Sequence, residues 1–386
     1  MVFHIFSALV GLVKVRLDHA NIDSHVFRLH YRWTTSLCFI SCALVVAVEY
    51  IGDPIQCMTN TDAPAEKAIN TYCWISSTFT INSTEKEGAI PGLGQEQEGY
   101  HERTYHSYYQ WVPFILFFQG CLFYLPHLIW KANEGKTVNT ILQGLHENSL
   151  DKDIDKKKEN IIKYLKESQG RNNKYSLVYF ICEILNLVNV LGQIVLMDAF
   201  FNNNFLRYGF KVVQYAVEQS DEDPFQTVFP KVTKCTFRRY GPSGTLNVQQ
   251  PICILPQNIL NQKVFIILWF WFVILSTITC MQLVWRLIVS ASPIIRVRIM
   301  ERRGKIDANS KLEKAIQRLH LGDFYLLDIL GHNLDALTFW DIFVGATKDM
   351  DPNVDNVNYK PVGMIDEEDD PIVMKRRMEL IDGASV

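Results

Sequence analysis

The chain has 386 residues, a formal net charge of −3 and 48% hydrophobic residues, and its mean hydropathy is close to zero. A near-neutral charge without a basic face argues against a nucleic-acid partner. These averages would suit a soluble protein, but the apolar residues are concentrated in four blocks and the charges lie between them. The segregation predicts an all-α membrane protein in which four spanning helices form a bundle.

An apolar stretch at the N-terminus, residues 2–15, precedes the first block. Phe3, Phe6, Val10 and Val13 fall on one helical face. The stretch lacks the basic start and small-residue cleavage site of a signal peptide, and 14 residues are too few to cross a bilayer as a helix. We therefore expect a short amphipathic helix within segment 1–32, with its apolar face against a membrane or other helices.

The second block is the clearest membrane span. Trp111–Trp130 contains no Asp, Glu, Lys or Arg over 20 residues, a length that matches the roughly 30 Å hydrocarbon core of a bilayer. Aromatic residues at both ends fit the belts found at membrane interfaces. A buried helix of a soluble protein is the alternative, which the three other blocks disfavour.

The four predicted spans are 33–51, 108–130, 179–201 and 264–290.

The third span is the most polar of the four. Asn186, Asn189 and Gln193 recur at spacings of three and four, so they share one helical face. Glu183 would cost about 2.5–3.5 kcal/mol in lipid, and we expect it to face a protein interior or water. Hydrogen bonds between helices are a better explanation of this face than a direct role in permeation.

The segments outside the spans differ in character. Residues 151–167 have dense mixed charge and predict a solvated helix. Aromatic and β-branched patches such as 232–240 predict some β structure in the second long loop, and 347–386 is acidic and expected to be disordered. These segments are the N-terminal 1–32, the first long loop 52–107, the basic loop 131–178, the second long loop 202–263, the helical region 291–346 and the acidic tail 347–386.

Lys and Arg near the span ends predict the orientation. Segment 131–178 carries ten of them, whereas 52–107 carries three and 202–263 carries seven. Both termini are therefore expected in the cytoplasm and the two long loops outside the plasma membrane. The only N-x-S/T sequon, at Asn82, lies in the first of these loops, where glycosylation is possible.

Cysteines agree with this orientation, because the four outside the spans all lie in the loops predicted to be extracellular, where disulfides persist. If the first and fourth spans are neighbours, bonds Cys57–Cys253 and Cys73–Cys235 would join the loops. Pairing within each loop, Cys57–Cys73 and Cys235–Cys253, is the alternative. The five others are expected to be small packing residues within the spans: Cys38, Cys42, Cys121, Cys182 and Cys280.

No motif of bond-making chemistry is found. The sequence lacks H-E-x-x-H, C-x-x-C, a P-loop and G-x-S-x-G. We expect no enzyme activity, no cofactor and no metal site. His25 and His30 are interpreted as a polar pair beside the membrane and not as metal ligands.

Tyr108–Tyr109–Gln110–Trp111 followed by Val112 resembles the signature of the innexins, the invertebrate gap-junction proteins. The likeness runs from about residue 3 to 345 and is greatest to insect members. Two cysteines per loop also fit innexins and not connexins, which use three. Further similar stretches are 26–31, 50–57, 70–75, 229–237 and 268–272.

The resemblance implies a four-span subunit of a ring around a pore, with eight subunits favoured by family precedent. Two such hemichannels on apposed cells dock through their extracellular loops and pass ions and small metabolites. Disulfides between the loops are the family expectation. The implied partners are further copies of the chain, other innexins and membrane lipid.

The resemblance also suggests roles for particular residues. Val2, Phe3 and Phe6 would narrow the pore at its cytoplasmic mouth. Glu49 and Asp53 would lie near the extracellular mouth, where a ring of carboxylates favours cations; a hydrogen bond or salt bridge that anchors the loop is an equal alternative for each.

The Tyr108–Trp111 stretch is expected to hold the first loop to the helix bundle. Two other functions stay open: an undocked hemichannel that releases small solutes, and an adhesion or scaffold component. A glycan at Asn82 that projected along the pore axis would block docking.

Overall fold

The structure is a computed structural model of the whole chain. The residues described are 22–59, 63–81, 93, 103–134, 137–142, 151–218, 225–241, 243–304 and 310–347. Three predictions lie outside them: the N-terminal helix with Val2, Phe3 and Phe6, the sequon at Asn82, and the acidic tail.

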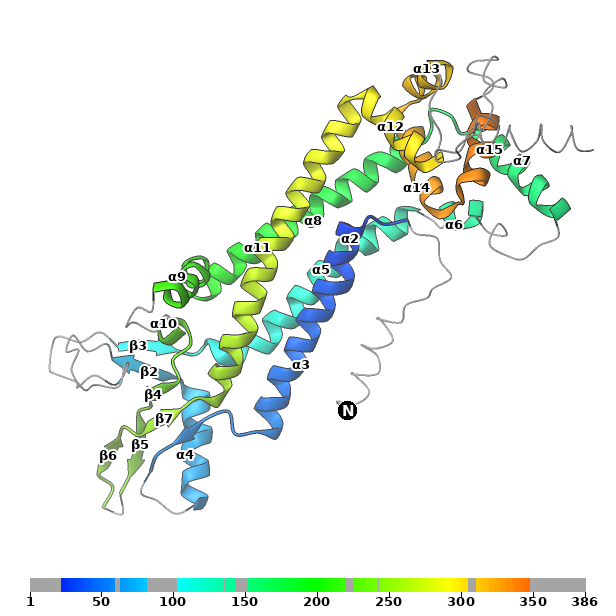
Figure 1. The fold of residues 1–386 in the computed structure, drawn as a ribbon. Helices are drawn as coiled ribbons and strands as arrows, with labels where there is room; N and C mark the ends of the chain where they lie inside the picture. Colours follow the sequence, from blue (N-terminus) through cyan, green and yellow to red (C-terminus); the bar gives the residue numbers. More distant parts are fainter. Residues whose placement is uncertain are drawn as a thin grey trace, which may run out of the picture. The chain divides into compact units, whose positions relative to one another are not determined.

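Four long apolar helices dominate the described chain, and each coincides with one predicted span (Figure 1). They are His25–Ile51, Tyr108–Glu134, Asn173–Phe200 and Pro256–Ala291. All four are longer than the predicted spans, because favourable helical sequence continues past the apolar blocks. The all-α four-span class is thereby confirmed.

The helices are α2 (His25–Arg28), α3 (Thr35–Ile51), α4 (Ala63–Ser76), α5 (Val112–Glu134), α6 (Thr137–Leu142), α7 (Asp151–Glu167), α8 (Asn173–Phe200), α9 (Phe205–Glu218), α10 (Phe225–Val228), α11 (Pro256–Ala291), α12 (Pro293–Gly304), α13 (Ser310–Arg318), α14 (Leu321–Asn333) and α15 (Ala336–Thr347). A π-helical turn, Leu29–Thr34, joins α2 to α3, and a 3₁₀ turn, Tyr108–Trp111, leads into α5. The strands are β1 (Gln56–Cys57), β2 (Thr78–Ile81), β3 (Arg103–His106), β4 (Val232–Lys234), β5 (Phe237–Tyr240), β6 (Leu246–Gln249) and β7 (Ile252–Ile254).

The π-helical turn is tied to α11 by side chains. The indole N–H of Trp271 donates to Thr34 Oγ1 at 2.8 Å, and His30 Nε2 lies 2.8 Å from Thr279 Oγ1. His30 is fully buried against α11. A widened turn exposes backbone groups that side chains can bond, which is why such turns often need tertiary contacts.

The chain divides into two compact units. The first contains His25–Leu128 and Glu183–Met281, and its core includes Phe123, Phe265 and Phe272. The second contains the described parts of Ile129–Cys182 and of the chain from Gln282 onward. We call its helices α6, α7 and α12–α15 the helical unit.

The helical unit has its own apolar core, built from α7, α14 and α15 among others. Ile161 and Leu165 of α7 are buried there, and Lys158 forms a 2.7 Å ion pair with Asp341 of α15. The sequence had predicted α7 with the same bounds but as a solvated helix. One face is instead packed, because its four apolar residues share a side that the dense charge obscures.

The two long loops form a mixed structure, which we call the loop unit: α4 with strands β1–β7. Antiparallel pairing gives a five-stranded sheet in the order β1-β7-β4-β2-β3, and β5 pairs with β6 in a separate hairpin. Some β structure was predicted, but helices α4 and α9 were not. Both are segments of 14 residues among Gly, Pro and charged residues that favour loops.

Candidate functional site

The sheet of the loop unit combines strands from both loops. Strands β1, β2 and β3 come from the first loop, and β4 and β7 come from the second. Two of its four pairings therefore cross between loops: β1 with β7, and β2 with β4. Backbone hydrogen bonds such as Met58 N–H to the Ile252 carbonyl, 2.8 Å, extend the first of these. The two loops consequently form one folded body.

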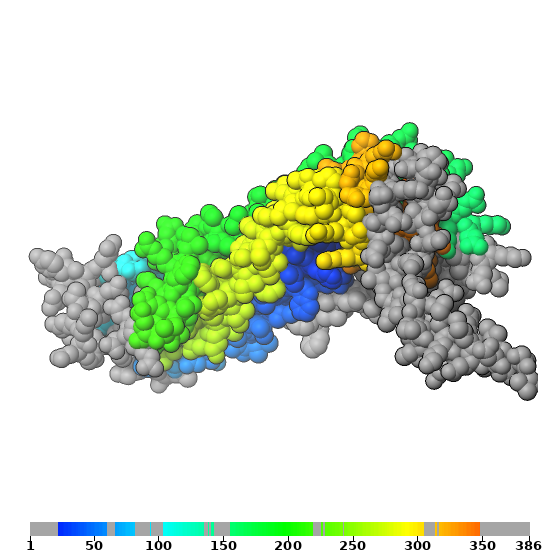
Figure 2. Space-filling view, turned by 45° about the horizontal axis from the view of Figure 1, so that its top comes forward, coloured from blue at the N-terminus to red at the C-terminus, as the bar shows by residue number. Residues whose placement is uncertain are grey.

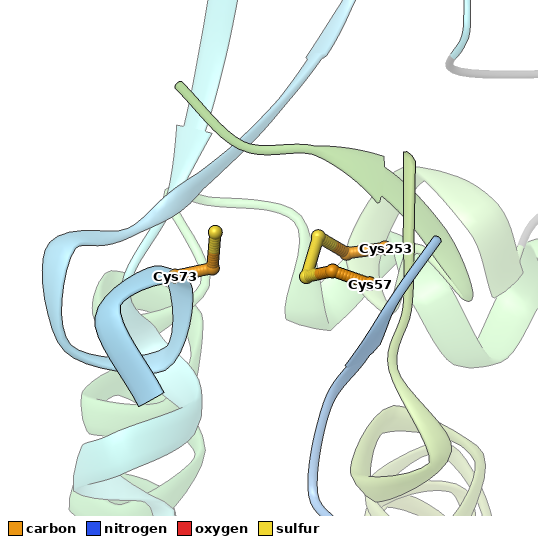
Figure 3. Close-up of side chains that lie close together, drawn as sticks. All are labelled: Cys57, Cys73 and Cys253. Atoms are coloured by element: carbon orange, nitrogen blue, oxygen red, sulfur yellow. A yellow bond between two sulfur atoms is a disulfide. The ribbon is translucent and has the colours of Figure 1, made fainter. Parts of the chain in front are cut away.

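Two disulfides add covalent links to the same body. Cys57 is bonded to Cys253 (Figure 3), and Cys73 is bonded to Cys235. Cys57 and Cys253 stand directly opposite each other on β1 and β7, while Cys73 comes from α4. Both bonds run between the loops, which is the arrangement expected if the first and fourth spans are neighbours. Pairing within each loop does not occur.

The cysteines also form the centre of a small apolar cluster with Ile55, Ile69 and Leu255. The sulfur atoms of Cys57, Cys73 and Cys253 lie within 4.8 Å of one another. The disulfides bring these sulfur atoms together. Binding a metal ion through thiolates would require both disulfides to be reduced first.

A buried histidine that the sequence did not single out lies in β3. His106 Nε2 is 2.9 Å from Thr80 Oγ1 on β2, and its ring makes an edge contact with Tyr108. Burial lowers the pKa of His106 to about 4, so its ring is neutral at physiological pH. No sequence pattern separates this histidine from the other nine, since its burial depends on the β2–β3 pairing.

The Tyr108–Trp111 stretch contacts both the loop unit and the long helices. The Tyr108 ring packs against Phe201 at the end of α8 and against Phe229 after α10. Tyr109 is buried with its ring 4.5 Å from that of Trp74, in α4.

Gln110 completes these contacts through its side-chain amide. Its nitrogen donates to the carbonyl oxygens of Trp74 and Ile75 in the last turn of α4, and such carbonyls have no partner within the helix itself. Trp111, in contrast, is exposed. Three of the four signature residues therefore connect loop to bundle within the first unit.

The two carboxylates predicted near a pore mouth lie around the end of α3. Glu49 is half-buried in the last turn, and Asp53 is exposed two residues past the helix. Gly52 ends α3 with its N–H bonded to the Val48 carbonyl, and a Cβ there would lie 2.8 Å from that oxygen. No described residue forms an ion pair with either carboxylate.

The polar face of the third span is directed into protein. Glu183, Asn186 and Gln193 are buried, as expected for groups that lipid would penalise. The amide of Gln193 donates to Asn189 Oδ1 at 3.3 Å. This bond lies within α8.

The span cysteines are only partly the packing residues that we expected. Cys38 and Cys182 are buried, and Cys42 is half-buried with its thiol 3.3 Å from the Pro113 carbonyl. Cys121 and Cys280 are exposed on the described chain. Helical position alone could not separate these two groups, because every face of a spanning helix can be apolar.

Long apolar helices joined by disulfide-linked loops define a multi-pass membrane protein. The innexin family model matches residues 23–350. The chain is 41% identical over 352 residues to innexin inx3 of Drosophila melanogaster, with 88% of each chain covered. It is 39% identical over 358 residues to innexin inx2 of Schistocerca americana, covering 90% of this chain and 98% of the relative.

A further relative is innexin shaking-B of Drosophila melanogaster, 39% identical over 347 residues that cover 88% of this chain and 92% of the relative. The chain belongs to the innexin family. Innexins are subunits of gap-junction channels, so the chain is a structural subunit of an intercellular channel that passes ions and small metabolites.

Proposed function

We propose that the loop unit is the extracellular surface through which two rings of this chain dock, with both termini in the cytoplasm. The observation that carries this proposal is the joining of the two loops by two disulfides and two strand pairings. Docking requires a surface that keeps its shape against a partner ring, and a preorganised surface loses less entropy on binding. Oxidised cysteines also require a compartment in which disulfides persist.

The Tyr108–Trp111 stretch would transmit this rigidity to the membrane helices. Tyr109 and Gln110 hold the end of α4, and Tyr108 packs against α8. Loss of the Gln110 amide would leave carbonyls of α4 without partners, at about 1–3 kcal/mol for each group that is buried. Gln110→Leu should therefore reduce docking, and Gln110→Glu should reduce it as well, because a carboxylate cannot donate to these carbonyls.

The subunits would form a ring, with eight copies as the expected number. Glu49 and Asp53 would face its extracellular mouth, where repetition by symmetry makes a carboxylate ring that attracts cations. Glu49→Gln and Asp53→Asn should shift the reversal potential, measured under a salt gradient, toward the equilibrium potential of the anion. Glu66→Gln, elsewhere in the first loop, is the matched control and should leave it unchanged.

The constriction would be formed by Val2, Phe3 and Phe6 at the cytoplasmic mouth. Enlarging that constriction by Phe3→Ala and Phe6→Ala should raise the size limit of permeating dyes. End-on imaging of the purified oligomer would give the subunit number, which sets the radius of the pore.

The docking proposal is tested by dye transfer between paired cells that express only this chain. Transfer that stops when either Cys57 or Cys73 is replaced by Ser would support it. Dye uptake by unpaired cells without transfer would favour a hemichannel, and preserved cell contact without uptake or transfer would favour adhesion. Asn82→Gln should leave dye transfer unchanged. If the native chain shows no transfer and Asn82→Gln restores it, a glycan at Asn82 blocks docking.

A further inference from the structure

Helix α9 begins directly after the third long helix. Asn202 and Asn203 have φ angles of 53° and 60°, a left-handed conformation that Asn tolerates better than most residues. The carboxylate of Asp198, near the end of α8, accepts the N–H of Leu206 at 2.9 Å. This turn places α9 against the bundle without an intervening linker.

One face of α9 is packed on α11. Phe205 and Tyr208 are buried, and the Tyr208 hydroxyl donates to the Gln262 carbonyl at 3.3 Å. Gly209 approaches Trp269 so closely that a Cβ would lie 2.1 Å from the indole. The helix therefore cannot turn about its own axis without breaking these contacts.

A second face of α9 is apolar and exposed. Leu206, Phe210, Val213 and Val217 are 44%, 68%, 43% and 77% exposed. Their spacing of four, three and four residues puts them in a sector roughly 60° wide at about 100° per residue. We call these four residues the apolar stripe. Solvent exposure of such a stripe is unfavourable, at about 25 cal/mol for each Å².

The third face is polar and also exposed. Arg207, Lys211, Gln214 and Glu218 occupy the next sector, again roughly 60° wide, and the Gln214 amide donates to Glu218 at 2.8 Å. The helix thus presents protein, apolar and polar faces about 120° apart around its axis. A helix with this pattern suits a place where protein, lipid and water meet.

The position of α9 along α11 fits the same place. Trp269 lies five residues after residue 264, where the fourth span is predicted to begin, which corresponds to about 8 Å along a helix. Interfacial helices bury their apolar face about 5–10 Å into the boundary between headgroups and acyl chains. Figure 2 shows α9 (green) and α11 (yellow-green) side by side on the surface.

The apolar stripe is also continuous with the exposed surface of the spanning helix. The Phe210 ring lies 5.2 Å from that of Trp269, which lies 5.0 Å from that of Phe270 on the outer side of α11. The apolar stripe is therefore in contact with the same medium as Phe270. Arg207 and Lys211, beside the stripe, could extend their charged ends to lipid phosphates while their alkyl stems cover apolar surface.

We propose that α9 lies in the extracellular membrane interface and inserts its apolar stripe among the acyl chains of phospholipid. This inference rests on the orientation given under Proposed function. It assigns the second loop two roles: strands β4–β7 belong to the docking body, while α9 holds the base of that loop to the bilayer.

Photocrosslinking tests the proposal on the full-length oligomer in vesicles of palmitoyl-oleoyl-phosphatidylcholine. A benzophenone amino acid is placed at Phe210, Val213 or Val217, and at Gln214 or Glu218 as matched controls on the polar face. We expect phospholipid adducts, identified by mass, at the three stripe positions and at least five-fold less at the two controls. The same variants are assayed for dye transfer, so that lipid contact and channel activity are read separately.

Crosslinks from the stripe to a second copy of the chain would overturn the inference, and so would equal adduct yields on the two faces. Benzophenone at Phe117, Val195 and Ile267, exposed positions on three spanning helices, serves as the reference for bilayer contact. If at least one of these yields a lipid adduct and the stripe does not, α9 is not interfacial and the membrane placement of the spanning helices stands. If none does, the membrane placement itself fails.

Discussion

The loop unit and the helical unit are held together by different means. Among the described residues, the apolar cluster of the loop unit has seven buried members, four of them disulfide cysteines, whereas the core of the helical unit has seventeen and no disulfide. A small body cannot bury enough apolar surface to offset its conformational entropy, so it needs covalent links. The helical unit reaches the same end without a disulfide, mainly through side-chain packing.

The contrast also concerns polar contacts. In the helical unit, Asp323 at the start of α14 accepts the N–H of Gly170 at 2.9 Å and the amide of Asn172 at 2.8 Å. A Cβ at Gly322 would lie 2.4 Å from the backbone of Asn172. These hydrogen bonds fix the position of α14 relative to residues 170–172, in a unit that apolar packing already stabilises. In the loop unit, backbone pairing between loops is itself the main non-covalent link.

Loss of a disulfide should therefore have the largest effect of any single change. The double variant Cys57→Ser/Cys253→Ser removes a link across 196 residues. Because Cys73–Cys235 still closes most of that stretch, the loop released is roughly 34 residues, for which the chain-entropy model gives about 4 kcal/mol. We expect the loop unit to unfold, dye transfer to cease and the helical unit to remain protected in limited proteolysis.

The control for this variant is Cys121→Ser, which replaces an exposed cysteine without a disulfide and should leave dye transfer intact. Wild-type transfer in the double variant would contradict our view that the loop unit depends on its covalent links.

A cavity in the helical unit should have the next largest effect. Leu330→Ala removes a fully buried side chain of α14, at a cost of about 3 kcal/mol. Proteolysis should then cut α14 and α15 faster, while non-reducing peptide mapping still finds both disulfides. Leu337→Ala, at an exposed position of α15, should change neither. Equal sensitivity of the two variants would mean that packing does not hold this unit.

Acid should weaken the loop unit selectively. The pKa of His106 falls from 6.5 to about 4 on burial, so between these values the unfolded state binds more protons than the folded state. Stability therefore falls as pH falls through this window, by about 2 kcal/mol at pH 5 relative to pH 7. Hydrogen exchange at β2 and β3, corrected for intrinsic rates, should show this loss.

The variant His106→Gln keeps a hydrogen-bonding group toward Thr80 without a titrating proton, and should abolish the acid effect at β2 and β3. Peptides from α14 provide an internal reference. If wild type and His106→Gln lose protection equally at pH 5, another group carries the acid sensitivity.

The smallest expected effect is at a helix cap. Asp335 Oδ2 accepts the N–H of Thr338 at the start of α15 at 2.9 Å, and Asp335→Ala should cost about 1 kcal/mol. Asp335→Asn, which can still accept this bond, should cost less. Thermal unfolding of the helical unit measures the difference, and identical losses in the two variants would show that the cap does not matter.

Local patterns in the sequence were enough to predict the four spans. Apolar blocks such as Trp111–Trp130 determine where long helices form, because helical hydrogen bonds connect residues four apart. The same holds for α7, whose bounds follow from its own residues. The family could be inferred as well, since the Tyr108–Trp111 stretch and its companions are contiguous in sequence.

Features that join distant residues needed the tertiary structure. Sequence left two pairings open for Cys57, Cys73, Cys235 and Cys253, and only the strand order β1-β7-β4 brings Cys57 opposite Cys253. The burial of His106 and the packing of one face of α9 on α11 were equally out of reach. Each depends on a partner tens to hundreds of residues away, and periodicity carries no information about such partners.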